Sequence, residues 1–434
     1  MAGTPADKFR DFMEVTGPAY LTGADTIINE AVERRYLWGD LVKGKERAIQ
    51  GGTEIRETLM TSDGATFQYS QPNETFSWQT PQVLDTVSAD WRFAVDHLAW
   101  TDHEVELNAG AGLTNDALKV AYKRLKRAKE QRMVTSLVNG LEASLWTTPW
   151  GNVSEMESSS GKVPFSIPCF ITENGKTIEG EYKGYTPTSA GAWTTVAGID
   201  PDDQAVWGNQ VVFYDKGKGA NDAATSQTYH EYHIDESASD TTHNVYGLIT
   251  AFDEMFLKLD FRPPSTSAEY FENASMNQQK IVCSRVGINE YKRALRDSND
   301  RLVSMQDAAY SAPAYSGIPL TYASSLDTAA LYNSHADAIL DTYAGRNDAS
   351  DVLHTALVGG TEFHDNTIDK GARYYWINGE YMTPFVHSRR YMVKHDVMRH
   401  PNQPFANIQP TDTWWNLLAS SRMRHGIVSP RESS

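Results

Sequence analysis

The chain has few cysteines, no long apolar run and a shortage of positive charge. Its 434 residues include two cysteines, Cys169 and Cys283, which lie far apart in segments with strand-like neighbours. Two free thiols are favoured over a disulfide between them, as in proteins made in a reducing compartment. The apolar runs are too short to span a bilayer. The first fifteen residues are charged and lack the apolar core of a secretory signal.

The charge balance argues against a dedicated nucleic-acid-binding protein, whose domain is usually basic. The net charge is −17, from 39 basic and 56 acidic residues. One stretch departs from this balance, because residues 119–132 hold a basic cluster against a single acid, Glu130. The cluster consists of Lys119, Lys123, Arg124, Lys126, Arg127, Lys129 and Arg132. A solvated helix face is the ordinary interpretation, and the density of the cluster makes a contact with a polyanion the alternative.

Signatures of catalysis and metal binding are incomplete. Residues 175–177 read GKT, but Phe170 stands where a phosphate-binding loop needs its first glycine. A Gly-x-Ser-x-Gly nucleophile elbow is absent. Residues 230–233 (HEYH) lack the spacing that places two imidazoles on one helical face. We therefore predict no catalytic residue, no metal site and no cofactor, and a protein that is not an enzyme.

The pattern predicts a long helix over residues 114–146, with Thr114-Asn115 as its N-cap and Pro149 after its end. At 1.5 Å per residue it would extend about 50 Å, which is far longer than an ordinary helix. Its apolar residues follow one stripe: Leu118, Ala121, Tyr122, Leu125, Ala128, Met133, Val134, Leu137, Val138, Leu141 and Leu145. No heptad repeat is sustained, so we expect a one-sided spine helix and not a coiled coil.

Before this helix, residues 53–97 alternate polar and apolar side chains and predict a long β-hairpin. An isolated hairpin is marginal in water, so it needs a partner surface. Aromatic side chains, which are favoured as interface anchors, lie along this segment. These are Phe67, Tyr69, Phe76, Trp78, Trp91 and Phe93.

The remaining elements alternate without a regular strand–helix rhythm, which predicts an α+β fold. No repeat of 20–50 residues is present. Helices are expected at residues 25–38, 245–259 and 289–296, and strands at 165–172, 210–214, 280–284 and 318–322.

Short motifs in a fixed order resemble those of tailed-bacteriophage major capsid proteins. They are GGTEIRETL (51–59), DWRFAV (90–95), VAGID (196–200), WGNQ (207–210), KIVCSRVGINEYKRAL (280–295), GIPL (317–320), a strand at 375–381, a turn at 399–403 and a terminal strand at 416–426. Thr58 stands where the family has a proline, and Ile288 where it has its first tyrosine. Residues 323–372 match no family element.

The resemblance implies a Hong Kong 97-like fold, of α+β class, whose parts can be assigned along the chain. Residues 1–50 would form the N-terminal arm and 51–98 the extended β-hairpin loop (E-loop). Residues 99–245 would hold the long spine helix and the peripheral (P) domain with loop insertions. Residues 246–372 would be mainly the axial (A) domain, and 373–434 the return strands of the peripheral domain.

The resemblance also implies a function and partners. The chain would be the major capsid protein of a tailed double-stranded DNA phage, assembled in the bacterial host cytoplasm into hexamers and pentamers of an icosahedral head. Expected partners are other copies, the portal protein, a scaffolding protein, a decoration protein and packaged DNA, which the basic cluster would face; no membrane is involved. An encapsulin-type nanocompartment shell is the nearest alternative. An extracellular acidic hydrolase is a distant one, because it needs a signal and an acid/base site.

Two details follow for assembly. About fifty residues precede the extended loop, so no cleaved N-terminal prodomain is expected and a separate scaffolding protein would guide assembly. Some relatives join subunits through a lysine on this loop, but this chain has no lysine between Lys45 and Lys119. An isopeptide bond needs an amine nucleophile. We therefore predict a shell held by non-covalent packing of the hairpin.

Overall fold

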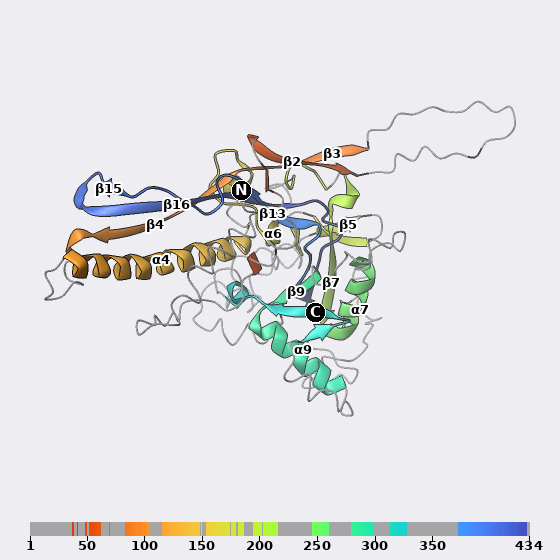
Figure 1. The fold of residues 1–434 in the computed structure, drawn as a ribbon. Coiled ribbons are helices and arrows are strands. Elements are labelled where there is room, and N and C mark those ends of the chain that lie inside the picture. The colour runs from red at the N-terminus through yellow and green to blue at the C-terminus, as the bar shows by residue number, and fades with distance from the viewer. Residues whose placement is uncertain are drawn as a thin grey trace, which may run out of the picture.

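The computed structural model describes residues 37–38, 41, 48–49, 52–61, 69, 83–104, 115–147, 149, 153–173, 175–178, 181–185, 194–201, 203–215, 245–259, 279–298, 313–327 and 372–431. Within these ranges, helices and strands mix in an α+β arrangement with three sheets. Figure 1 shows a long layer, a projecting hairpin and a second sheet flanked by helices.

The hairpin is a two-stranded sheet of β2 (Glu54–Met60) and β3 (Leu84–Asp90). Ile55, Val87 and Ala89 are buried at its base, and Figure 1 shows the hairpin projecting from the body. The predicted hairpin over residues 53–97 is wrong at its end. Residues beyond Trp91 form β4 (Arg92–Thr101), which pairs with a different strand because its alternate residues cover the long helix.

The strand that pairs with β4 is β16 (Gln403–Ala419), which is central to a six-stranded sheet among the described residues. β4 runs antiparallel along one side of β16. Its other side pairs with β13 (Met382–His387), β14 (Val393–Lys394) and β15 (Met398–His400), and β1 (Ala48–Ile49) joins β13. β15 and β16 meet at residues 401–402, as expected for the predicted turn at 399–403.

Helix α4 (Asn115–Leu145) lies along β4 and β16 (Figure 1). Its 31 residues confirm the predicted long helix. The buried apolar residues of its C-terminal half repeat at three- and four-residue spacing, which forms one apolar face. They are Met133, Val134, Leu137, Val138, Leu141 and Leu145. Met133 packs with Leu98 and Trp100 of β4. The side chains of residues 115–125 lie outside the described set.

The second sheet has nine strands in the described part, in the order β10-β11-β9-β12-β17-β7-β6-β5, with β8 beside β7. Their bounds are β5 Gly175–Ile178, β6 Glu181–Gly184, β7 Asn209–Asp215, β8 Val245–Tyr246, β9 Gln279–Cys283, β10 Ala314–Tyr315, β11 Ile318–Tyr322, β12 Tyr374–Asn378 and β17 Gly426–Arg431. The helices α7 (Leu248–Leu259) and α9 (Arg285–Ser298) share its core, where Phe252 contacts Tyr291, Tyr374 and Trp376.

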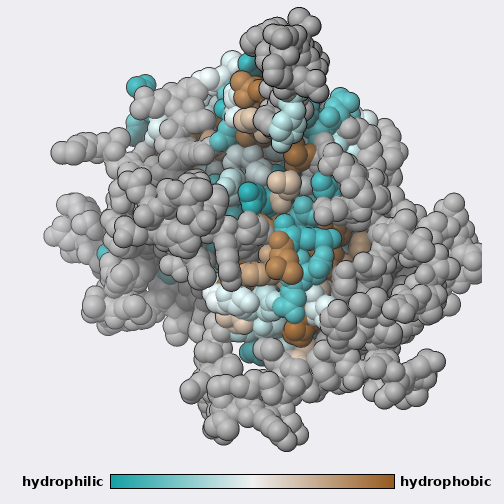
Figure 2. Space-filling model, turned by 90° about the vertical axis from the view of Figure 1, so that its right-hand side faces the viewer, coloured by the Kyte–Doolittle hydropathy of each residue, from teal (hydrophilic) through white to brown (hydrophobic). Residues whose placement is uncertain are grey.

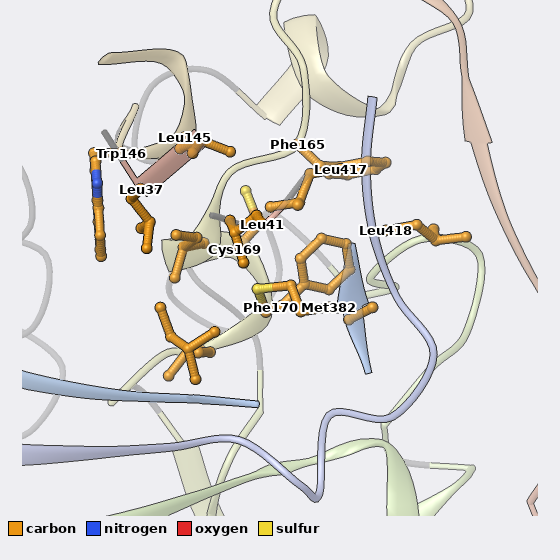
Figure 3. Close-up of a cluster of buried hydrophobic side chains, with 14 of the residues drawn as sticks. Leu37, Leu41, Leu145, Trp146, Phe165, Cys169, Phe170, Met382, Leu417 and Leu418 are labelled. Carbon is orange, nitrogen blue, oxygen red and sulfur yellow. The ribbon is translucent and has the colours of Figure 1, made fainter. Parts of the chain in front are cut away.

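The largest core cluster joins parts of the chain that are far apart in sequence. Figure 3 shows Leu37 and Leu41 in one cluster with Trp146, Phe170 and Met382. The short elements α5 (Val153–Glu157), α6 (Ile167–Phe170), η2 (Ala205–Trp207) and η4 (Ser324–Asp327) complete the described fold. Both cysteines are free, as expected, and both are buried. Burial raises the pKa of the Cys169 thiol to about 11.

Most predicted elements are confirmed, with two corrections. The strand expected at residues 165–172 is wrong, because Ile167–Phe170 form the buried helical turn α6, with Pro168 in its first turn. The terminal strand expected at 416–426 is also wrong. It contains the end of β16, a turn, and the first residue of β17. The helix expected at 245–259 starts at Leu248, and the one at 289–296 extends over Arg285–Ser298. Of the helix expected at 25–38, only Leu37 and Trp38 are described, and both are helical.

Candidate assembly surfaces and the junction that positions them

The hairpin presents apolar side chains outside the core. Met60 and Leu84, at the outer ends of β2 and β3, are 67% and 54% exposed. Tyr69, a described residue between β2 and β3, is 92% exposed. Of the other predicted interface anchors, Phe67, Phe76 and Trp78 lie outside the described residues.

Trp91 and Phe93 belong to the body of the molecule. Trp91 is buried, and its indole N–H donates to the Gly52 carbonyl oxygen at 3.1 Å. Its ring also lies 5.5 Å from that of His387. Phe93 is 59% exposed on β4 and packs edge-on against Trp414, with 4.6 Å between ring centres. Trp91 therefore fixes the base of the hairpin inside its own subunit, whereas Phe93 remains available for an outside contact.

The described members of the basic cluster of α4 differ in their contacts and exposure. The Lys129 ammonium donates to the Ala99 carbonyl oxygen at 2.9 Å and forms an ion pair with Glu104. This hydrogen bond from Lys129 lowers the pKa of Glu104. Arg127 and Arg132 are exposed and Lys126 is half-buried. The side chains of Lys119, Lys123 and Arg124 lie outside the described set. The one acid of this stretch, Glu130, pairs with Lys394 near β14.

A buried arginine holds four segments together where the sheets meet. Arg422, in the turn after β16, is fully buried. It donates to the carbonyl oxygens of Phe170, Tyr185 and Trp207 at 2.9, 2.9 and 2.8 Å, and to Oδ1 of Asn209 at 3.4 Å. Burial lowers the pKa of this guanidinium to about 9.

His425 lies in the same turn as Arg422, and Asn416 lies near the end of β16. Nδ1 of His425 accepts the Asn378 backbone N–H at 3.2 Å. Burial, with a smaller contribution from the nearby Arg422 charge, lowers the pKa of His425 to about 3. Oδ1 of Asn416 accepts the Phe165 backbone N–H at 2.8 Å, while its amide donates to the Asp90 carbonyl oxygen at 2.6 Å. The contact between Asn416 and Asp90 brings the end of β16 to the base of the hairpin.

Two of the sequence motifs, VAGID and WGNQ, meet at this junction. The Trp207 indole N–H donates to the Val196 carbonyl oxygen at 3.0 Å. The Ala197 carbonyl oxygen accepts the Ser88 N–H of β3 at 3.0 Å. Ala197 has φ 53° and Gly198 φ 89°, so a tight turn presents this carbonyl. Sequence reasoning singled out these motifs but assigned their residues no role. The junction sets the position of the hairpin.

The described ranges contain no group of three or more His, Cys, Asp or Glu side chains that could hold a metal ion. Residues 230–233, for which we predict no metal site, lie outside those ranges. None of the described helices is long and apolar enough to cross a membrane. On the face in Figure 2, small apolar patches alternate with hydrophilic ones among the coloured residues.

Comparison with known proteins gives structural similarity alone. No family model matches the chain, and no curated protein matches it. The capsid asymmetric unit of cyanophage A-1(L) is similar over 94% of this chain and 98% of that chain, at 10% identity and TM-score 0.45. The capsid of a native GTA particle is similar over 96% and 99%, at 11% identity and TM-score 0.43. A structure from Mycobacterium phage Bobi is similar over 95% and 97%, at 8% identity and TM-score 0.41.

Proposed function

We propose that this chain is the major capsid protein of a tailed double-stranded DNA bacteriophage. The observation that carries the proposal is the order of elements. A projecting hairpin, β4, the 31-residue helix α4 and then two sheets follow the order of the family motifs. In this proposal, β2–β3 is the extended loop and α4 is the spine helix. The six-stranded sheet belongs to the peripheral domain, and the lobe of α7 and α9 to the axial domain.

The exposed surface of the hairpin suits a protein that binds to further copies of itself. The hairpin exposes Met60, Leu84 and Tyr69 instead of burying them in its own subunit. Large exposed apolar side chains on a projecting element are favoured as interface anchors. The proposed partners are further copies, in hexamers and pentamers, together with portal, scaffolding and decoration proteins. Copies would be held together without covalent cross-links.

Electron microscopy of the purified chain, expressed alone and together with the proposed scaffolding protein, tests this function. We expect closed icosahedral shells, and boiled shells should give one band near the 48.4 kDa monomer on a denaturing gel. Small shells filled with an enzyme cargo would favour the encapsulin-type alternative. A monodisperse monomer with no shell would refute both shell proposals, and a ladder of covalent oligomers would refute the non-covalent one.

We also propose that Lys126 and Arg132 of the basic cluster contact packaged DNA. Replacing Lys126 and Arg132 by alanine should weaken DNA binding by the purified chain. The slope of log K against log salt should fall by about 2, because each phosphate contact contributes about 0.9. Lys129→Ala is the matched control, since its ammonium already bonds to Ala99 and Glu104. An unchanged slope in the double variant would contradict this role.

A further inference from the structure

A second basic stretch lies in the segment between β13 and β16. Residues 387–400 contain a single acid, Asp396, and four arginine or lysine residues: Arg389, Arg390, Lys394 and Arg399. This stretch is far from the basic cluster of α4 in the sequence, but Figure 1 shows β15 and the start of α4 at the same end of the long layer. The register of the sheet decides which of these cations lie on the side of α4.

Lys394 lies on the α4 face of the six-stranded sheet. The hydroxyl of Thr411 in β16 donates to the sulfur of Met133 in α4 at 3.4 Å, so the Thr411 side chain points toward the helix. Lys394 is the residue of β14 opposite Thr411. Because residues opposite each other in a sheet project to the same face, Lys394 also faces α4. Its ion pair with Glu130 of α4 agrees with this assignment.

Arg399 lies on the same face, nearer the end of the sheet. It is opposite Asn407 of β16, and Asn407 precedes Thr411 by four residues. Alternate residues of a strand share a face, so Asn407 and Thr411 both point toward α4. The Asn407 amide donates to Oδ1 of Asp102, the residue after β4, at 2.9 Å. Arg399 is exposed, so it is a solvated cation on the α4 side of the sheet.

The two remaining arginines lie on the opposite face. Arg390 forms an ion pair with Asp412 at 3.4 Å and lies over the Trp414 ring at 5.6 Å. Asp412 and Trp414 are even-numbered residues of β16, so they point away from α4. Burial, followed by the charges of Arg389 and Arg390, lowers the pKa of His387, whose ring lies 5.3 Å from that of Trp414. Arg389 is exposed near this group and therefore offers a control cation off the α4 face.

Lys126 of α4 lies on the side of the helix that faces β14 and β15. It precedes Glu130 by four residues, which places both side chains on one side of the helix, and Glu130 pairs with Lys394 of β14. The helix positions before Glu130 approach β15, because the start of α4 lies at that end of the sheet (Figure 1). Among the described residues, neither Lys126 nor Arg399 forms an ion pair. We call Lys126 and Arg399 the α4–β15 basic face.

We propose that Arg399 is a further residue that contacts the phosphate backbone of double-stranded DNA, on the α4–β15 basic face. The proposal rests on the DNA contact proposed above for Lys126 and Arg132. It adds a residue from the sheet and assigns the contact to one face of that sheet. A guanidinium presents two parallel N–H donors to a phosphate, and each neutralised phosphate releases counterions. Phosphate contacts carry no sequence information, so this binding is independent of DNA sequence.

Arg399→Ala tests the contact. Binding of a short DNA duplex of random sequence to the purified chain is measured over a series of salt concentrations. The slope of log K against log salt should fall by about 0.9 in Arg399→Ala, whereas Arg399→Lys should keep the wild-type slope. Arg389→Ala is the matched control, because it removes an exposed arginine from the opposite face, and its slope should equal that of the wild type.

The melting temperatures of both alanine variants should be unchanged, because surface substitutions have small effects on stability. An unchanged slope in Arg399→Ala would overturn the contact, and so would an equal reduction in Arg389→Ala or the absence of DNA binding by the wild type. A reduced slope in Arg399→Ala alone, together with a wild type that forms no shells, would refute the capsid function and leave the contact standing. Shells with an unchanged slope would refute only the contact.

Crosslinking to DNA distinguishes the two faces in a second way. The Arg399→Cys variant is labelled with a photoreactive group, bound to the duplex and illuminated. The two natural cysteines are buried, so little label reaches them. Val95→Cys is the control, because Val95 is exposed and points away from α4, whereas Leu98 and Trp100 of β4 pack with Met133. DNA adducts should be several-fold more abundant for Arg399→Cys. Equal yields from the two variants would overturn the assignment to the α4 face.

Discussion

Replacing Arg422 by alanine is expected to lower the free energy of unfolding by about 3–5 kcal/mol. The guanidinium is fully buried and donates to three backbone carbonyls from segments far apart in the chain. Hydrogen bonds from a charged group contribute about 1.5–3 kcal/mol each. Alanine leaves these carbonyls without donors and opens a cavity. Urea unfolding of the purified, unassembled chain measures the effect.

Arg424→Ala is the matched control. It removes the same side chain two residues later, from a partly exposed position. A surface substitution of this kind changes stability by about 0.5 kcal/mol or less. Arg422→Lys should fall between the two variants, because an ammonium cannot reproduce the planar fork of donors. Equal stability of the two alanine variants would show that Arg422 does not hold the junction.

Acidification from pH 7 to pH 5 is expected to cost the folded chain about 2 kcal/mol through His425 alone. The folded-state pKa of His425 is lowered to about 3, against about 6.5 when unfolded. Between these values the unfolded chain binds the extra proton. The contribution of His425 to the free energy of unfolding is therefore fully present above about pH 6.5 and is lost as the pH falls toward 3. Protonation would place a second positive charge beside buried Arg422.

His425→Gln tests this dependence, because glutamine does not titrate. The variant is expected to be less stable at pH 7, but its urea midpoint should fall less between pH 7 and pH 5 than that of the wild type. His103→Gln removes an exposed histidine and should follow the wild-type curve. If the urea midpoint of His425→Gln fell as steeply between pH 7 and pH 5 as that of the wild type, a group other than His425 would cause the loss of stability in acid.

The sequence alone determined the elements with strong periodicity. The apolar stripe of α4 predicted its course within a residue of the observed Asn115–Leu145. The strands near residues 210–214, 280–284 and 318–322 were also found. These patterns depend on local spacing, which the chain carries by itself. The sequence also predicted that the two cysteines are free, because they are few and far apart in the chain.

Tertiary structure decided what local pattern could not. β4 continues the alternation of β3, yet it pairs with β16 more than three hundred residues later, and no local signal separates the two sheets. The 165–172 segment has strand-like composition, but burial among the core elements fixes it as the turn α6. Arg422 and His425 stood in a sequence motif without a role. Their function as buried donor and acceptor exists only because four distant segments present backbone groups to them. Hydrogen bonds between residues far apart in sequence form only when the fold brings them together, so the sequence could place these side chains in the chain but could not show what they hold.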